Sequence, residues 1–405
     1  MFLNGLNLQM HRGMHSCVRL TLPLPSSALP ASGSLGIISA RYYVAPLVFR
    51  QNKGMHGFFK KANCIFAPML NLTEFLQLRQ HLPVIDVRSE SEFEQGHVPQ
   101  AINLPILNNE ERKIVGTLYK QQGPKQAIKE GVRLVGPRLS EILAQAEQIA
   151  NGKEVLVHCW RGGMRSNNFC WLIERLGIKS QALQGGYKAY RTKVLESFTQ
   201  PFQLIVLSGS TGSGKTEILQ ELKKQGEQII CLETLANHKG SAFGGLGLGE
   251  QPTTEQFQNN LFEEILQLDL NKRIWIEDES IAVGKIFVPE PLWKNLRTSP
   301  IVKVDVPREV RVQRLVEDYG KVDKELLLDA MKKITKKLGG QHFNTAKEKL
   351  LENDLATTAD ILLTYYDKAY TKSLENRESR IISEISWDGT HIADFVKEKL
   401  NHIDT

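Results

Sequence analysis

The stretch that decides how the second half of this chain folds is Gly209-Ser210-Thr211-Gly212-Ser213-Gly214-Lys215-Thr216. It matches the phosphate-binding pattern G-x-x-x-x-G-K-[ST], with the apolar segment 203–207 before it and a helical pattern after it. The glycines let backbone N–H groups face phosphate oxygens, and the N-terminus of the following helix adds its positive end. We predict a polyphosphate site formed by Gly209, Gly212, Gly214, Lys215 and Thr216, with the Thr216 hydroxyl suited to a magnesium ion.

A second polar segment belongs to the same predicted domain. The apolar strand 273–276 ends in three carboxylates, Glu277, Asp278 and Glu279. In phosphoryl-transfer sites, an acid near the phosphate loop holds the magnesium ion. Glu277 and Asp278 are therefore candidate metal-binding or catalytic acids, although the sequence does not choose among the three, and a solvated acidic strand end is the other interpretation. The loop itself predicts only that a polyphosphate binds, because hydrolysis, kinase transfer and diphosphate recognition share this cradle.

The hydrophobic pattern places these motifs in a chain of two α/β units. Six short apolar segments predict buried strands, two in a first unit and four in a second: 82–87, 154–157, 203–207, 227–232, 273–276 and 301–304. After Glu309 the pattern is mainly helical. A boundary in the polar stretch 185–200 gives four regions: a leader (1–70), a first domain (71–196), a phosphate-binding domain (201–310) and a mainly helical C-terminal region (311–405).

The first unit contains a second chemical centre, Cys159-Trp160-Arg161-Gly162-Gly163-Met164-Arg165-Ser166. This segment follows a predicted strand and precedes a helix, whose N–H groups and dipole stabilise a thiolate. Two arginines add positive charge, so we predict a low pKa and a nucleophilic, catalytic Cys159. Its candidate donor-binding residues are Arg161, Gly162, Gly163 and Arg165. Cys170 falls on the apolar face of the helix and is predicted to be structural.

Charge is distributed unevenly along the 405 residues. Seven of the 51 Lys and Arg residues and none of the 45 acidic residues lie in 1–73, so the rest of the chain carries 44 basic and 45 acidic side chains. Nucleic-acid binding must therefore depend on local clusters and not on the overall charge. An acid-free leader that contains arginine and serine is typical of an organelle transit peptide; a disordered extension and a true start at Met69 are the alternatives.

The cysteines and the hydropathy indicate the compartment. Five scattered cysteines without paired spacing favour free thiols in a reducing environment: Cys17, Cys64, Cys159, Cys170 and Cys231. No apolar run reaches the roughly 18 residues that a membrane helix needs. We expect a cytoplasmic protein without a membrane span, or an organellar one if residues 1–70 are a transit peptide.

Residues 86–103, from Asp86-Val87-Arg88 through Gly96-His97-Val98-Pro99, strongly resemble the first signature of rhodanese-like domains, which carry sulfur as a cysteine persulfide. The resemblance implies that Asp86 and Arg88 support a loop and that His97 is a scaffold residue. The cysteine loop departs from the shorter rhodanese form, because Cys159 to Arg165 has the C-x-x-x-x-x-R spacing of cysteine phosphatases. Such a loop has room for a phosphate-like donor, and a phosphatase stays open as an interpretation.

The ordered set of motifs resembles one family, the tRNA 2-selenouridine synthases. The set joins the cysteine loop, Gly185-Gly186-Tyr187-Lys188-Ala189-Tyr190-Arg191 and the phosphate loop. Further matches are 236–244, 277–280 and Tyr365-Tyr366-Asp367, and the resemblance covers residues 72–400. It implies an α/β fold: a rhodanese-like domain followed by a P-loop NTPase-like domain with a mainly helical C-terminal part.

The resemblance also implies a reaction, the replacement of sulfur by selenium at position 2 of the wobble 2-thiouridine in certain tRNAs. The implied donor is selenophosphate, and the implied intermediate is an S-geranyl-2-thiouridine made from geranyl diphosphate. Cys159 matches the family's catalytic cysteine, expected to carry selenium as a selenosulfide, and the phosphate loop would hold the geranyl diphosphate. Alkylation makes sulfur a better leaving group, and a clamped diphosphate leaves readily from an allylic carbon. Magnesium is compatible with the second site, and the implied partners are tRNA and a source of selenophosphate.

Two basic segments are candidate tRNA surfaces. Residues 111–138 hold seven basic side chains against two acids, and residues 331–349 hold six lysines against one acid. Such clusters give affinity for phosphates without sequence choice, although solvated charge runs are the alternative. Three arginines share a helical face that either reaches phosphates or is a solvated stripe: Arg308, Arg311 and Arg314. Three aromatic residues are candidates for stacking on an extruded uridine: Trp160, Tyr187 and Tyr190. Core packing is the alternative for Trp160 and Tyr187.

Two other classes of protein stay open at this point. One is a rhodanese-type sulfurtransferase fused to a P-loop small-molecule kinase, which would need ATP and a phosphorylated product. The other is a non-catalytic nucleotide switch, for which the reactive loop around Cys159 would be unnecessary. Purine-nucleotide affinity or turnover would favour either of them.

Overall fold

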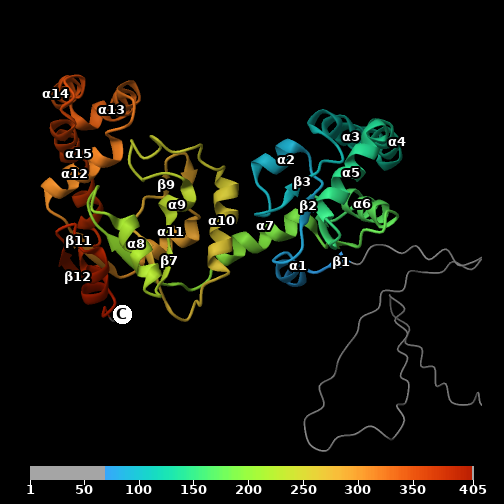
Figure 1. Cartoon of the computed structure of the whole chain (residues 1–405), viewed down its shortest axis with the longest axis horizontal. Helices are drawn as coiled ribbons and strands as arrows, with labels where there is room; N and C mark the ends of the chain where they lie inside the picture. The colour runs from blue at the N-terminus through green and yellow to red at the C-terminus, as the bar shows by residue number, and fades with distance from the viewer. Residues whose placement is uncertain (1–68, 404–405) are drawn as a thin grey trace, which may run out of the picture. The chain divides into compact units, whose positions relative to one another are not determined.

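The computed structural model describes residues 69–403 (Figure 1). The predictions made for the leader lie outside the described residues, apart from its last two positions, and Cys17 and Cys64 lie outside them as well. Within residues 69–403, no helix combines the length and the apolar character that crossing a membrane requires.

The first domain is built on a five-stranded parallel sheet in the order β1-β5-β4-β2-β3. Its strands are β1 (Met69–Leu70), β2 (Val84–Asp86), β3 (Ile102–Asn103), β4 (Val155–His158) and β5 (Ser180–Leu183). Strands β2 and β4 are buried along their whole length, as parallel strands covered on both faces are. Because neighbouring strands run the same way, the ends of β2 and β4 meet at one edge, where Asp86 is in register with His158.

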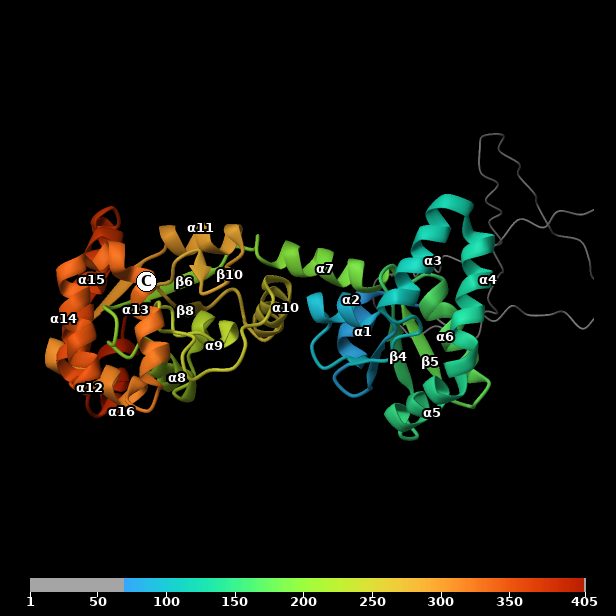
Figure 2. The same ribbon diagram turned by 90° about the horizontal axis from the view of Figure 1, so that it is seen from above.

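Helices cover both faces of this sheet. They are α1 (Leu72–Leu78), α2 (Glu90–Gln95), α3 (Asn109–Gln122), α4 (Pro124–Val135), α5 (Leu139–Ala150), α6 (Met164–Glu174) and α7 (Gly186–Ser197), with a 3-10 turn at Gly136–Arg138. Helices α5 and α6 pack on the face that carries Ile85 and Val157, whereas α1 and α7 pack on the face that carries Val84 and Leu156. Helices α3 and α4 lie side by side as a hairpin (Figure 2).

A buried ion pair fixes the loop after β2. Asp86 and Arg88 are almost completely buried, and the Arg88 guanidinium donates to the Asp86 carboxylate at 2.6–3.0 Å and to the Gly96 carbonyl at 2.8 Å. The guanidinium also lies over the Tyr187 ring, 3.8 Å from its centroid. These contacts agree with the expectation that Asp86 and Arg88 support the loop.

The second domain carries a five-stranded parallel sheet in the order β12-β11-β6-β8-β7. Its strands are β6 (Gln203–Ser208), β7 (Gln228–Ile230), β8 (Arg273–Glu277), β11 (Ile301–Asp305) and β12 (Ile381–Ser386). The four strands predicted for this domain are confirmed. Strand β12 was not predicted: it is an edge strand without a fully buried residue, so it lacks the continuous apolar run by which the other four were identified.

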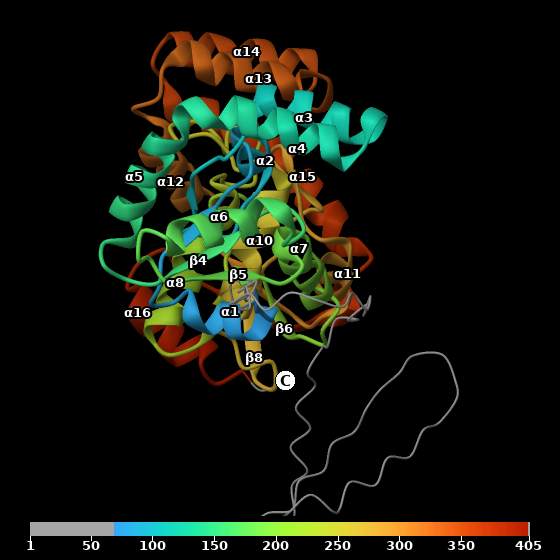
Figure 3. The ribbon, with the colours of Figure 1, turned by 90° about the vertical axis from the view of Figure 1, so that its right-hand side faces the viewer.

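Helices surround this second sheet and dominate its C-terminal part. They are α8 (Lys215–Lys224), α9 (Leu232–Ala236), α10 (Thr254–Ile265), α11 (Glu290–Thr298), α12 (Arg308–Tyr319), α13 (Lys324–Leu338), α14 (Gly340–Leu351), α15 (Leu355–Glu375) and α16 (Ile392–Phe395). Shorter elements are the hairpin β9 (Ala282–Val283) and β10 (Ile286–Phe287), a 3-10 turn at Glu378–Arg380 and a π turn at Val396–Leu400. The mainly helical structure predicted after Glu309 is confirmed, and α13 and α14 lie side by side (Figures 1 and 3).

Helices α7 and α10 join the two domains. The Tyr187 hydroxyl donates to Glu255 and accepts from Asn259, both at 2.8 Å, and the Tyr190 hydroxyl donates to Glu263 at 2.8 Å. Both tyrosine side chains are completely buried. The polar stretch that the sequence predicted as a domain boundary is therefore a packed helix, and it ties the cysteine domain to the phosphate-loop domain.

Replacing Arg88 by methionine should destabilise the first domain by about 3–5 kcal/mol, because the Asp86 carboxylate would remain buried without its partner. Arg133 is the control, since it pairs with Glu130 on the exposed side of α4. Arg133→Met should leave the melting temperature unchanged. Thermal unfolding followed by circular dichroism measures both effects, and a wild-type melting temperature for Arg88→Met would contradict the structural role of the pair.

Candidate functional site

The cysteine centre lies between β4 and α6, as the sequence predicts: Cys159 follows β4 directly, and α6 begins five residues later. Gly162 has a φ of +62°, and an added Cβ would come within 2.5 Å of the Leu183 carbonyl oxygen. Gly186 has a φ of +59° and packs directly against the Cys159 carbonyl, which also accepts the Tyr187 N–H at 2.8 Å. Only glycine fits at either position, so the cysteine loop and the start of α7 can pack backbone against backbone.

The Cys159 thiol is buried and yet favours its ionised form. The residue is 3% exposed, and its Sγ lies 3.3 Å from the Ser166 hydroxyl. Burial opposes ionisation, but hydrogen bonds from the Ser166 side chain and backbone, the charge of Arg165 and the backbone of Gly163 together hold the pKa of Cys159 below its ordinary value. The thiolate is the nucleophilic form of cysteine, so this centre is suited to attack on an electrophile.

The four predicted donor-binding residues differ in their relation to the Cys159 thiol. Gly162 and Gly163 form the turn, and the charge of Arg165 lowers the Cys159 pKa. Arg165 also pairs with Glu92 at 2.7 Å, which fixes the guanidinium. Arg161, by contrast, is exposed to solvent. Donor binding by all four residues stays a prediction.

The aromatic side chains near this centre do not all reach solvent. Tyr187 and Tyr190 are completely buried, so the expectation that they stack on an extruded uridine is wrong. Core packing, the alternative for Tyr187, holds for that residue, and Tyr190 packs in the core as well. Trp160 is 36% exposed and remains a candidate for stacking.

Two further residues, His97 and Cys170, make contacts that indicate structural roles. The His97 ring stacks on Phe93, with centroids 3.8 Å apart, and its Nδ1 lies 3.0 Å from the Phe93 carbonyl oxygen. These contacts agree with a scaffold role. Cys170 is fully buried, and burial raises the pKa of its thiol to about 12, which agrees with a structural cysteine.

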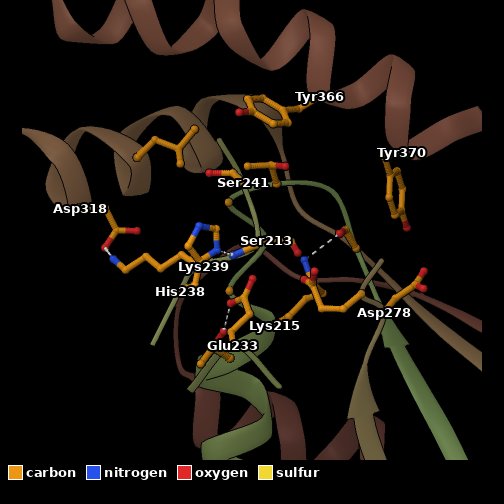
Figure 4. Close-up of a pocket in the computed structure, with 18 of the residues that line it drawn as sticks. Ser213, Lys215, Glu233, His238, Lys239, Ser241, Asp278, Asp318, Tyr366 and Tyr370 are labelled. Atoms are coloured by element: carbon orange, nitrogen blue, oxygen red, sulfur yellow. Dashed lines mark hydrogen bonds and ion pairs between the residues drawn. The ribbon is translucent and has the colours of Figure 1, made fainter. Parts of the chain in front are cut away.

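The phosphate loop faces a pocket of about 1000 Å³ (Figure 4). Its walls come from the loop itself, the segment 233–241 after β7, the end of β8, and helices α11, α12 and α15. Gly212 and Gly214 have φ values of +82° and +76°, and a side chain on Gly212 would press on the backbone of Arg311. The carboxyl ends of three adjacent parallel strands thus meet at the pocket, which is where open α/β sheets bind ligands.

Lys215 is the cation of this pocket that is free to bind an anion. Its Nζ donates to the Gly209 carbonyl at 3.2 Å. Among the lysines and arginines that line the described pocket, it alone has no carboxylate oxygen within 4 Å. The other three form ion pairs: Lys239 with Asp318, Arg297 with Asp278, and Arg314 with Glu217.

Three carboxyl groups crowd together near the end of β8: Glu233 and Glu279, which line the pocket, and Glu277, which does not. Glu277 is completely buried and accepts the backbone N–H of Glu233; burial, and then the nearby Glu233 charge, raise the pKa of Glu277 to about 8. The same two causes raise the pKa of Glu279 well above its ordinary value. Glu233 itself accepts the Thr216 hydroxyl at 2.7 Å. A bound cation would relieve this crowding of negative charge.

Asp278, the other predicted acid, is occupied by a structural ion pair. Arg377 donates to both of its carboxylate oxygens at 2.8–2.9 Å, and Ser208 donates to one of them at 2.7 Å. Arg377 is itself buried. Of the two candidate acids, Asp278 lines the pocket but is held by Arg377, whereas Glu277 is buried next to Glu233 and does not line the pocket.

The oxygens of Thr216 and Glu233 fit a magnesium ion that is bound mainly through its ligand. Within residues 69–403, no group of three or more His, Cys, Asp or Glu side chains could enclose a metal ion. Magnesium, however, usually takes one or two protein oxygens and completes its shell with phosphate and water. Glu233 was not predicted as a site residue. The sequence feature that could have identified it is its position three residues after β7, the apolar strand next to β8.

The arginines of α12 are all paired with carboxylates. Arg308 pairs with Asp360 and Asp367, and Arg314 lines the pocket beside Glu217. Arg311 is 7% exposed and donates to Asp367 at 2.8 Å and to the Thr211 carbonyl at 3.3 Å. The solvated-stripe interpretation is therefore wrong for Arg311, which supports the phosphate loop from behind.

Comparison with known proteins finds matches along both domains. Residues 202–403 match the family model described as the tRNA 2-selenouridine synthase AAA domain, and residues 71–193 match that of the rhodanese-like domain. The chain is 36% identical over 352 residues to the tRNA 2-selenouridine synthase of a Sulfurovum species, covering 78% of this chain and 94% of that protein. The enzyme of that name from Nitrosomonas europaea is 32% identical over 369 residues (78% and 95%), and that from Bdellovibrio bacteriovorus is 42% identical over 251 residues (60% and 65%).

Iodoacetamide at pH 7 should alkylate Cys159 on the order of 100-fold faster than Cys170 or Cys231, because the pKa values of the latter two thiols are raised to about 12 and few of them are ionised. Ser166→Ala should move the pH profile of Cys159 alkylation upward, since a hydrogen bond to the thiolate is lost. Peptide mass spectrometry between pH 6 and 10 measures both. Ser180→Ala, next to Cys170, is the control, and an unchanged profile in Ser166→Ala would refute this account of the thiol.

Glu277 should make the protein less stable as the pH rises. Its folded-state pKa is raised to about 8, so the native state is favoured at low pH and loses stability as the pH rises toward and through 8. Glu277→Gln keeps the shape without the ionisation, so its melting temperature should exceed that of the wild type by more at pH 9 than at pH 6, in EDTA. Glu290→Gln, on the exposed side of α11, should show no such trend, and a parallel pH response of Glu277→Gln and wild type would contradict the raised pKa.

Proposed function

The chain belongs to the tRNA 2-selenouridine synthase family, and on this basis we propose that it replaces sulfur by selenium at the wobble 2-thiouridine of tRNA. Selenophosphate is the proposed donor, and S-geranyl-2-thiouridine, made from geranyl diphosphate, is the proposed intermediate. One observation carries the proposal: the same chain holds a low-pKa thiol between a strand and a helix N-terminus, and a phosphate loop whose lysine has no carboxylate partner within 4 Å among the described residues.

The first proposed step is prenyl transfer at the phosphate loop. The thiouridine sulfur attacks C1 of geranyl diphosphate, the C1–O bond breaks, and the diphosphate leaves with the electron pair while the base loses a proton. Lys215 and the loop N–H groups stabilise the charge that develops on the diphosphate. A magnesium ion held at Thr216 and Glu233 would supply further Lewis-acid stabilisation of the leaving group. The pocket, at about 1000 Å³, has room for the nucleoside beside the diphosphate.

The second proposed step is selenium delivery at Cys159. Selenium in selenophosphate is already at the oxidation level of a selenide, so a Cys159 selenosulfide would require an oxidant. A redox-neutral route begins when the selenium of selenophosphate displaces geranyl thiol from C2 of the base. The Cys159 thiolate then attacks phosphorus, the P–Se bond breaks with its electrons left on selenium, and water hydrolyses the phosphocysteine. The phosphatase-like spacing of Cys159 and Arg165 supports this route over the selenosulfide expected from the resemblance.

The tRNA is proposed to bind through the two basic segments identified in the sequence. On the α3–α4 hairpin, the arginines Arg112, Arg133 and Arg138 pair with glutamates. Four lysines of this hairpin have no carboxylate within 4 Å among the described residues and are free to contact phosphates: Lys113, Lys120, Lys125 and Lys129. On α13 and α14, two of the six lysines, Lys332 and Lys349, pair with carboxylates.

Lys215→Ala should abolish geranylation of an anticodon stem-loop that carries wobble 2-thiouridine, because the diphosphate loses its positive partner. Cys159→Ser should still geranylate this RNA but should not selenate it. Nucleoside mass spectrometry after incubation with geranyl diphosphate, with and without selenophosphate, separates the two steps. The control is Lys294→Ala, which removes an exposed lysine on α11. Equal loss of both steps in both variants would refute this division of labour, and ATP-dependent phosphorylation would favour the kinase alternative.

A further inference from the structure

A second cavity adjoins the phosphate pocket and differs from it in chemistry. It has a volume of about 60 Å³ and lies among α12, α13, α14 and α15. Its lining is almost entirely hydrocarbon and aromatic: Phe243, Leu315, Val316, Leu327, Met331, Leu350, Leu355, Leu362 and Leu363, with the rings of Tyr319 and Tyr366. Apolar cavities of this kind exclude water and bind apolar molecules.

The two cavities share a wall. Five residues line both of them: Thr211, Ser241, Leu315, Tyr319 and Tyr366. Thr211 belongs to the phosphate loop itself, and Figure 4 shows Ser241 and Tyr366 on the side of the pocket above Lys215. A molecule with a phosphate head at Lys215 and an apolar tail can therefore direct the tail past Ser241 into the second cavity.

The hydroxyl groups of Tyr366 and Ser241 at this junction each accept a backbone N–H. The Tyr366 hydroxyl accepts the Ala242 N–H at 3.1 Å, which leaves the ring as the surface that faces the cavity. The rings of Tyr319 and Tyr366 lie 6.0 Å and 6.5 Å from the ring of Phe243, measured between centroids. An aromatic wall beside a phosphate cradle suits an allylic carbon that gains positive charge as its bond to oxygen breaks.

The far wall is closed. Met331 and Leu363 are completely buried, Leu350 is 1% exposed, and none of the three lines the phosphate pocket. An apolar tail long enough to pass this wall must displace closely packed side chains, which costs free energy. Methionine is the most adaptable of the three because it is unbranched, so Met331 is the side chain that adjusts to the end of a short chain.

We propose that this cavity receives the end of the hydrocarbon chain of the prenyl diphosphate and that Met331 sets the accepted chain length. The inference rests on the proposed function and adds to it the residues that select the substrate. The occupant is a prenyl chain of about ten carbons: the part next to the diphosphate lies in the phosphate pocket, and the last carbons lie against Met331. Burial of these carbons favours binding in proportion to the apolar area removed from water.

The test measures chain-length preference. Wild type, Met331→Ala and Met331→Phe are each given equal geranyl and farnesyl diphosphate, with the 2-thiouridine stem-loop as acceptor and mass spectrometry as the readout. Met331→Ala should raise the ratio of farnesyl to geranyl product about 10-fold or more, since a pocket of this kind discriminates by roughly 10-fold to 200-fold per carbon group. In a second mixture that contains equal geranyl and dimethylallyl diphosphate, Met331→Phe should slow geranyl transfer while five-carbon dimethylallyl transfer continues. The matched control is Leu326→Ala, because Leu326 lies on the exposed side of the same helix and is 52% exposed.

The outcomes separate the two proposals. A wild type that transfers no prenyl chain of any length overturns the proposed function and the cavity assignment with it. A wild type that transfers geranyl, with product ratios unchanged in both Met331 variants, overturns only the cavity assignment and makes the cavity a packing feature. If Met331→Ala does not fold, as judged by its melting curve, the milder Leu350→Val takes its place under the same criterion.

Discussion

A parallel strand that is covered on both faces can carry polar side chains only at its ends. In the first domain this constraint puts Asp86 and the cysteine loop at the adjoining ends of β2 and β4. In the second domain it puts the phosphate loop, Glu233 and Glu277 at the ends of β6, β7 and β8. Reactive groups that are far apart in the sequence are therefore gathered at one edge of each sheet, and both chemical centres depend on this arrangement.

Charges at these two edges are mostly paired, and the exceptions indicate what binds there. Arg165 is held by Glu92, and Asp278 is held by Arg377. Against this background, Lys215 lacks a carboxylate partner within 4 Å among the described residues, and Glu277 shares its burial with other carboxyl groups. Burying charged groups without a partner of opposite sign costs free energy. An anion at the lysine and a cation near the acids would each reduce this electrostatic cost.

Tyr187 connects the two chemical centres. Its backbone N–H holds the Cys159 carbonyl, its ring carries the Arg88 guanidinium, and its hydroxyl bonds to Glu255 and Asn259 on α10. One residue thus fixes the cysteine loop and joins it to the domain that holds the phosphate loop. The packing of this buried tyrosine therefore couples the position of the cysteine loop to α10 of the phosphate-loop domain.

Local sequence determined the phosphate loop, the strand before it and the low pKa of Cys159, because each depends on neighbouring residues: glycines, a helix N-terminus, Arg165 and Ser166. Tertiary structure alone decided which acid pairs with an arginine. Glu277 and Asp278 are adjacent in sequence and chemically alike, but Glu277, the last residue of β8, contacts Glu233, whereas Asp278, just after the strand, pairs with Arg377, almost a hundred residues further on. The apolar cavity and strand β12 likewise depend on distant helices and strands, whose packing no local pattern encodes.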